Sequence, residues 1–512
     1  MLDTDPLPWY LGLLAIVAAS SLFVLWIRQA RATLPLPPGP TPLPILGNTL
    51  DIPKSHPART FKEWSQKYGD IIYLHSPSQP MLVLNTLESA VELLDRRSSK
   101  YSSRPISVMA ELMTWSNAFG LREYSQEWRE QRKYFHECFH QGSVEKYVPL
   151  QTQGIRSFLR RALAPGPSYK IQEQVLFTLI SIVADVVYGI QVRDMNADYV
   201  VNARTALEGF VRSGEPGAFW VEFFPFLRFI PSWVPGATFK RFVEHYRPFV
   251  QRTFRGPFQI VKDSLVSVRH PYQTGLLMHH KQELENSPPC ATKELLYRIN
   301  NKDAGPESYT QQEQMVMESM GTVIAAATDT THSVLLCFLL AMAKYPEVQK
   351  KAQAELDLHV GPHRLPSIKD RTSLTYIRAI VLESLRWQPT APLCIPHLVL
   401  ADDEYNGYRI PKGTTILANV WAMLRDPEVY PSPEIFNPDR FLKDGALNPA
   451  IRDPRSVAFG FGRRICPGRH YSQNTLFLFI ASVLHVFNVV PATDSAGNPV
   501  PIEVNMTSEL IR

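Results

Sequence analysis

Residues 459–468 read FGFGRRICPG, a glycine-rich loop around one thiol, Cys466. An apolar helical pattern follows, and Pro467 suits the first position of that helix. Backbone N–H groups at the helix start, together with the arginines among residues 463–469, favour the thiolate form, which is the form that ligates metals. Glycine lets the backbone pass close to a flat ligand. The loop therefore favours a thiolate at Cys466, although a lone cysteine in a turn is by itself only a weak signal of a metal ligand.

Composition excludes several other classes of protein. The chain has 53 Lys and Arg against 48 Asp and Glu, a net charge of +5 without a long basic tract, so no nucleic-acid partner is expected. A dinucleotide loop would need a third glycine where Ile465 stands. Five cysteines without a CxxC pair argue against a disulfide framework or a structural zinc site. Four of them are expected to be small buried hydrophobic residues: Cys138, Cys290, Cys337 and Cys394.

An apolar stretch near the amino terminus predicts a membrane anchor. Residues 9–27 carry no charge and span about 28 Å as a helix, close to the thickness of bilayer hydrocarbon. Acidic residues precede the stretch and arginines follow it, which predicts a lumenal segment 1–8 and a cytosolic body. A cleaved signal peptide is the alternative, but the basic leading region that it requires is missing. A basic, Pro-rich hinge, residues 28–48, is expected to space the body from the membrane.

Residues 49–512 are expected to form one domain, since no repeat and no low-complexity linker divides them. The predicted fold class is mainly α with small β-sheets. Short β-rich runs are expected at 71–74 and 81–84, and Asn406-Gly407 predicts a tight hairpin within 404–411. Long apolar helical patterns cover residues 315–343, 374–387 and 467–487.

The loop resembles the haem-binding signature F-x-x-G-x-R-x-C-x-G of the cytochrome P450 family. Every defining position matches, and the matching residues are Phe459, Gly462, Arg464, Cys466 and Gly468. The resemblance implies a cytochrome P450 fold preceded by one N-terminal transmembrane helix. It also implies haem b (iron protoporphyrin IX), with Cys466 as the axial thiolate on iron and Arg464 paired with a haem propionate.

Two further segments follow in the family's order. Glu383 and Arg386 lie at positions i and i+3 of one helix face, within reach of each other. Alone they would suggest a solvated ion pair. The segment 436–441, FNPDRF, resembles the family's source of a second arginine, here Arg440. The resemblance implies a buried network of Glu383, Arg386 and Arg440 with a structural role in support of the haem loop.

Polar residues interrupt the apolar pattern at 315–343. A second membrane span is one interpretation, which an aspartate at its centre makes unfavourable. A functional interpretation has Thr330 bond a carbonyl one turn back, with Asp329 as its partner in a proton relay. Residues 326–331, AATDTT, resemble the family's oxygen-activation motif, with Ala327 in place of the usual glycine. That departure implies a narrower oxygen-binding groove.

Three more residues are candidates for haem binding by resemblance. Trp128 and Arg132 match the family's W-x-x-x-R, a helical pair that resembles a propionate clamp. His397 stands where family members often place another propionate donor. A satisfied surface histidine is the alternative for His397.

The resemblance implies an NADPH- and O2-dependent monooxygenase that inserts one oxygen atom into a medium-sized hydrophobic substrate: a terpenoid, a polyketide, an aromatic compound or a xenobiotic. Among family members the chain looks most like anchored fungal ones, which implies secondary metabolism or xenobiotic oxidation. A haem isomerase or dehydratase that needs no reductase and a non-catalytic haem sensor are the alternatives.

Electrons are expected to come from outside the chain, because no flavin- or nicotinamide-binding motif is found in it. The resemblance implies that they derive from NADPH and pass through a separate flavoprotein. The resemblance implies an NADPH–cytochrome reductase, which is expected to dock on basic residues such as Arg129, Lys133 and Arg463. The expected location is the endoplasmic reticulum membrane, crossed once, with the catalytic domain in the cytosol. Aromatic residues at 219–226 and 229–233 are expected to line an access channel or contact membrane lipid.

Overall fold

The structure is a computed structural model that describes residues 34–164, 170–215, 217–269, 290–300, 306–494, 496–502 and 504, together with Gly12, Ser20 and Ser21. The anchor expected at residues 9–27 lies outside the described residues apart from those three positions. The same holds for the lumenal segment 1–8 and the first part of the hinge.

Helices make up most of the described chain, as the sequence predicts. The α-helices are α2 (Pro57–Tyr68), α3 (Leu87–Ala90), α4 (Ser98–Tyr101), α5 (Val108–Leu112), α6 (Gln126–Phe139), α7 (Val148–Leu163), α8 (Ile171–Tyr188), α9 (Asp198–Ser213), α10 (Thr238–Arg269), α12 (Ala291–Asn300), α13 (Pro306–Lys344), α14 (Pro346–His359), α15 (Thr375–Trp387), α16 (Val420–Met423), α17 (Arg455–Ala458) and α18 (Arg469–Val486). Shorter helical turns are η1 (Val91–Arg96), η2 (Trp115–Asn117), η3 (Val144–Tyr147), η4 (Trp220–Glu222), η5 (Pro225–Phe229), η6 (Ile368–Thr372), η7 (Pro438–Phe441) and η8 (Gly462–Arg464).

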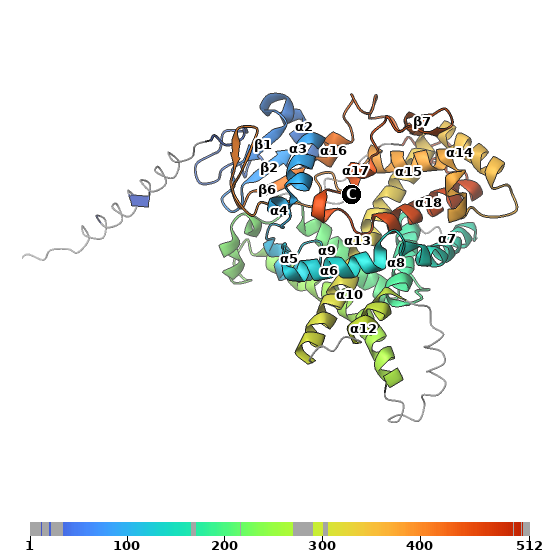
Figure 1. Cartoon of the computed structure of the whole chain (residues 1–512), viewed down its shortest axis with the longest axis horizontal. Helices are drawn as coiled ribbons and strands as arrows, with labels where there is room; N and C mark the ends of the chain where they lie inside the picture. Colours follow the sequence, from blue (N-terminus) through green and yellow to red (C-terminus); the bar gives the residue numbers. More distant parts are fainter. Residues whose placement is uncertain are drawn as a thin grey trace, which may run out of the picture.

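The long helix α13 organises the core. It packs against α8, α10, α12, α6 and α18, and the main apolar cluster joins side chains from these helices. Figure 1 shows α13 running behind α6 and α8, with α18 beside it. The three apolar patterns at 315–343, 374–387 and 467–487 correspond to α13, α15 and α18. Pro467 is a correction: it lies in a turn, because Gly468 caps α18 and the helix begins at Arg469.

The small sheets lie at two ends of the body: β1, β2 and β6 lie beside α2 and α3, and β7 lies at the other end beside α14 (Figure 1). The main sheet has the order β1 (Ile71–Leu74), β2 (Met81–Leu84), β6 (Thr415–Ala418) and β3 (His397–Leu398). Strand β2 is antiparallel to β1 and parallel to β6. The hairpin of β4 (Asp403–Tyr405) and β5 (Tyr408–Ile410) turns through Asn406 and Gly407, both with positive φ, as its sequence predicts. Strands β7 (Leu442–Lys443) and β8 (Ala446–Leu447) form the third sheet.

The described part of the Pro-rich hinge lies on the sheets rather than standing free. Tyr73 N donates to Pro38 O at 2.8 Å, and Arg409 N donates to Pro35 O at 2.8 Å. Gly39 passes so close to β1 that a Cβ there would lie 1.9 Å from Tyr73 O. The hinge from residue 34 onward is therefore docked onto β1 and β5.

Two described helices are long and apolar enough to cross a membrane, residues 171–188 and 309–344. Both pack into the core, where an apolar helix is also expected, so the interpretation of residues 315–343 as a second span is not supported by the packing.

Candidate haem site

The loop that carries Cys466 packs against η1, and one glycine makes that approach possible. Gly462 has φ +53°, and a Cβ at this position would lie 2.1 Å from Leu94 O. Cys466 N donates to Phe459 O at 2.8 Å, which closes the loop on itself. Cys466 is half-buried in front of α18. Only glycine fits where the loop crosses η1, and this crossing holds the thiol in place.

Burial raises the pKa of the Cys466 thiol, while the Gly468 N–H and the nearby Arg132 and Arg469 lower it. The prediction that the pKa of Cys466 is lowered was wrong for the protein alone. Burial raises this pKa by more than the N–H group and the two arginines lower it. A metal cation bound to the sulfur would add the charge that the thiolate needs.

One N–H group of Arg464 has no hydrogen-bond acceptor among the described residues. Its Nε donates to Ser102 O at 2.6 Å and its Nη2 to Arg122 O at 2.8 Å. Its guanidinium lies over the Trp128 ring, 4.2 Å from the centroid. Among the described residues, Nη1 of Arg464 and Nε1 of Trp128 are buried without a hydrogen-bond partner. Buried donors of this kind are usually satisfied by a ligand, an ion or an ordered water.

Arg132 and His397 also lie in this region. Arg132 Nη1 donates to Ile465 O at 2.8 Å, so it holds the residue before Cys466. His397 is buried, and its Nδ1 lies 2.7 Å from Tyr101 O, so the alternative of a surface histidine was wrong. Burial, with Arg104 and Arg464 nearby, lowers the pKa of His397 well below its ordinary value and keeps the ring neutral.

Arg104 belongs to the site and was missed by sequence reasoning. Its Nη1 donates to Ile395 O and Pro396 O, each at 2.7 Å, and its Nε to Gly120 O at 3.0 Å. Burial lowers the pKa of Arg104 to about 10. The sequence signal was slight: a lone arginine before a proline.

Charge decides what this pocket can bind. The hydrogen bonds described above take Arg104, Arg132 and Arg464 to backbone carbonyls rather than to carboxylates. Burial, together with Arg104 and Arg132, lowers the pKa of Arg464 to about 8. Buried cations without a counter-ion are costly, and a guanidinium prefers a carboxylate. The two propionates of a haem fit this charge and the orphaned donors, and Cys466 fits the iron.

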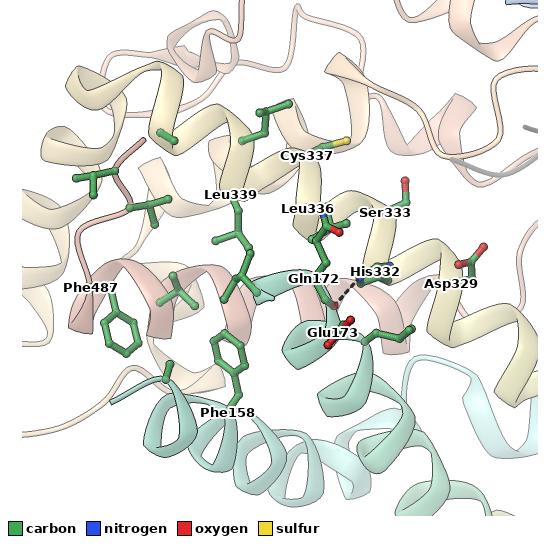
Figure 2. Close-up of a pocket in the computed structure, with 18 of the residues that line it drawn as sticks. Phe158, Gln172, Glu173, Asp329, His332, Ser333, Leu336, Cys337, Leu339 and Phe487 are labelled. Carbon is green, nitrogen blue, oxygen red and sulfur yellow. Dashed lines mark hydrogen bonds between the residues drawn. The ribbon is translucent and has the colours of Figure 1, made fainter. Parts of the chain in front are cut away.

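Thr330 and Asp329 lie on different sides of α13, because adjacent helical residues point about 100° apart. Thr330 Oγ1 donates to Ala326 O at 2.6 Å, the bond that the sequence predicts. Asp329 lines a cavity of about 1030 Å³ between α7, α8, α9, α13 and the end of α18. Figure 2 shows Asp329, His332 and Ser333 at this cavity, with Phe158 and Leu339 on its apolar walls. The relay between Asp329 and Thr330 stays a prediction, in which the two side chains leave α13 in different directions.

Glu383, Arg386 and Arg440 form a buried network. Arg386 makes a two-pronged contact with Glu383 at 2.7 and 2.8 Å, and Arg440 Nε lies 3.3 Å from Glu383 Oε1. The side chains of Glu383 and Arg386 are fully buried. The free N–H groups of both arginines donate to carbonyls within residues 424–435, so the contacts of the network hold that segment rather than the Cys466 loop.

Three basic side chains of α6 and the Cys466 loop are exposed to solvent: Arg129, Lys133 and Arg463. Arg129 and Arg463 both lie over the Tyr124 ring, 5.7 and 5.5 Å from its centroid, and Lys133 is one turn beyond Arg129 on α6. The three cations thus form one exposed patch, named here the basic patch.

A cysteine loop beside unpaired buried arginines, in a mainly helical fold with small sheets, defines a haem-thiolate class of protein. A sequence model of the family described as cytochrome P450 matches residues 37–510. The chain belongs to the cytochrome P450 family.

Relatives of similar length are fungal. The cytochrome P450 monooxygenase COX1 of Coprinopsis cinerea is 36% identical over 97% of this chain and 94% of its own. A cytochrome P450 monooxygenase of Armillaria gallica is 39% identical over 97% of this chain and 90% of its own. The tryptamine 4-monooxygenase of Psilocybe cyanescens is 35% identical over 98% of this chain and 95% of its own. The chain is a monooxygenase with a haem-thiolate cofactor and takes electrons from a redox partner.

Proposed function

We propose that this protein is an NADPH- and O2-dependent monooxygenase that inserts one oxygen atom into a medium-sized hydrophobic substrate in fungal secondary metabolism or xenobiotic oxidation. The observation that carries the site assignment is the buried arginine cluster beside Cys466, with the unsatisfied donors of Arg464 and Trp128. Haem, when bound, activates O2 and transfers one of its atoms.

The protein's own residues position that group. Cys466 ligates the iron, and Phe459, Gly462 and Gly468 shape the loop around it. Arg464 and Trp128 meet the propionates, joined by Arg104. His397 Nδ1 donates to Tyr101 O, so His397 can donate to a propionate from Nε2 only when its ring is protonated, which the negative charge of a propionate would favour. Arg132 acts mainly through its bond to Ile465 O, because that bond fixes the loop next to the ligand.

Thr330 is the residue closest to the proton chemistry in this proposal. Its hydroxyl donates a hydrogen bond to Ala326 O. The lone pairs of its oxygen can therefore accept a hydrogen bond from a water that carries a proton to the site. Asp329, about 100° around α13 from Thr330, borders the cavity and is the proposed source of the proton for that water.

Large aromatic side chains are exposed in the segment through which substrate is proposed to enter, around η4 and η5. Trp220, Phe226, Phe229 and Trp233 are all more than half exposed around η4 and η5. Such a patch fits contact with membrane lipid and entry of a hydrophobic substrate from it. One relative is named for an indole-bearing amine, tryptamine, and the others only as monooxygenases, so the proposal stays at the level of hydrophobic molecules.

An NADPH–cytochrome reductase with an acidic face is the proposed electron donor, and the basic patch is its proposed docking site. The proposed location is the endoplasmic reticulum membrane, with one N-terminal span and a cytosolic catalytic domain.

One preparation tests the function. The purified protein, reduced under carbon monoxide, should show the red-shifted Soret band of a haem thiolate, and Cys466→Ser should lose that band while it stays folded. With reductase, NADPH and hydrophobic compounds, mass spectrometry should detect products that gain one oxygen atom. Product without NADPH would indicate the isomerase instead, and haem binding without product or NADPH use would indicate the sensor.

A further inference from the structure

One short loop orients two arginines of the haem site. Residues 118–124 lie between η2 and α6, and two of their backbone carbonyls accept from those arginines. Gly120 O accepts from Arg104 Nε at 3.0 Å, and Arg122 O accepts from Arg464 Nη2 at 2.8 Å. The bond to Arg122 O, together with that of Arg464 Nε to Ser102 O, fixes the guanidinium of Arg464, so a displaced loop would change where its Nη1 points.

Helix α13 holds this loop with two side chains. Thr322 Oγ1 accepts from Phe119 N at 3.0 Å. Glu318 Oε2 accepts from Arg122 Nη2 at 2.7 Å. Glu318 and Thr322 are four residues apart on one helix face, and both are buried. The loop is thus attached to α13 at two consecutive turns.

Both carboxylate oxygens of Glu318 accept hydrogen bonds. Besides Arg122, its carboxylate accepts from Gln131 Nε2 at 3.0 Å and from Gln314 Nε2 at 2.8 Å. Burial raises the pKa of Glu318, while Gln314, Arg122 and Gln131 lower it. Only Arg122 offers an opposite charge among these partners, so the ion pair with Arg122 is the strongest tie between the carboxylate and the loop.

We propose that Glu318 is a positioning residue of the haem site: it holds Arg122, and the main chain of Arg122 in turn orients Arg464 toward a propionate. This inference rests on the proposed role of Arg464. It assigns a haem-site function to a carboxylate of α13 that is outside the cysteine loop and far from it in sequence.

The two ways in which Glu318 can affect the iron have opposite signs. Moving the positive Arg464 away from a propionate leaves more negative charge near the iron, which favours the oxidised state and lowers the midpoint potential. Removing the negative charge of Glu318 through space alone raises the potential. The sign of the change therefore separates positioning from simple charge.

The matched control lies one turn and a half away on the same helix. Glu313 is also a buried glutamate of α13, but it bonds Lys262 at 2.8 Å and Tyr309 at 3.1 Å instead of the loop. Glu313→Gln makes the same chemical change without touching residues 118–124. Arg464→Gln serves as the reference for a lost propionate contact.

The experiment measures the midpoint potential of each holoenzyme and the rate at which it loses haem to excess apomyoglobin. Glu318→Gln should lose haem about fivefold faster than the wild type, and its potential should fall as in Arg464→Gln. Glu313→Gln should match the wild type in both. Hydrogen exchange at residues 118–124 should quicken in Glu318→Gln but not in Glu313→Gln.

A double variant tests whether Glu318 acts on the haem site through Arg122. If Glu318 acts through Arg122, then Glu318→Gln with Arg122→Gln should lose haem no faster than Arg122→Gln alone. The inference is overturned if the two effects add, or if Glu318→Gln leaves the potential unchanged or raises it while Arg464→Gln lowers it. Absence of the haem-thiolate band in the wild type would instead overturn the proposed function.

Discussion

At the scale of single residues, buried charges without carboxylate partners distinguish the haem site from the rest of the core. The network of Arg386 and Arg440 contains a carboxylate, Glu383, with which both arginines pair. Arg464 instead bonds only carbonyls in the contacts described and keeps one buried N–H unsatisfied. The first arrangement serves folding, and the second prepares a place for an anionic ligand.

Gly462 provides a residue-scale prediction. Gly462→Ala puts a Cβ against Leu94 O and forces a non-glycine residue to a φ of +53°, so we expect it to cost about 1–3 kcal/mol of unfolding free energy and to lower haem content. Gly256→Ala is the control, since Gly256 lies in α10 and a Cβ there would meet nothing within 4 Å. Urea unfolding and haem quantification measure both. Equal stability of the two variants would contradict the claim that the crossing over η1 requires glycine.

At the scale of elements, two sets of contacts join segments that are distant in sequence. Glu383 and Arg386 tie α15 to residues 424–441 through carbonyls and the Asn437 N–H, which donates to Glu383 Oε1 at 2.7 Å. Glu222 ties η4 to the start of α5. Its carboxylate accepts from Ser107 Oγ, Val108 N and Met109 N at 2.8 to 3.1 Å.

Removing the charge of Glu383 should disrupt the first of these ties. Glu383→Gln leaves Arg386 buried without a counter-ion, so the unfolding free energy should fall by about 3–5 kcal/mol. Lys351→Ala, which removes an exposed ion pair with Asp439 at η7, should change the stability little. Denaturant midpoints of both variants decide the matter. A Glu383→Gln protein as stable as Lys351→Ala would show that the network is dispensable.

Glu222→Ala should loosen the second tie. Three donors at α5 lose their acceptor, so hydrogen exchange at residues 107–109 should quicken and an apolar ligand should enter and leave the enzyme faster. The neighbouring exposed pair of Arg228 and Glu111 offers a control, since Arg228→Ala leaves the helix cap intact. Stopped-flow ligand binding and exchange mass spectrometry test this. Faster exchange in Arg228→Ala alone would assign the tie to the ion pair.

At the scale of the whole molecule, the sequence was sufficient where the information is local. The helical pair of Glu383 and Arg386 and the Asn406-Gly407 hairpin lie within a few residues of their partners. Arg104 and Glu318 could not be assigned, because their meaning comes from contacts about two or three hundred residues away along the chain, such as those to Ile395 and Arg122. Periodicity shows that a residue is buried but does not name its long-range partner.

The basic patch provides a prediction about the whole molecule, because electrostatic steering depends on the summed surface charge. Reversal of any one charge, as in Arg129→Glu, Lys133→Glu or Arg463→Glu, should slow reduction of the iron by the reductase at low salt. The difference should shrink at high salt, where charges are screened beyond about 3 Å at 1 M. Lys412→Glu, at an exposed lysine after β5, changes the net charge equally and should reduce at the wild-type rate. Stopped-flow reduction under carbon monoxide measures this. Equal slowing in Lys412→Glu would mean that net charge, not the patch, sets the rate, and unchanged kinetics in all three patch variants would remove the docking proposal.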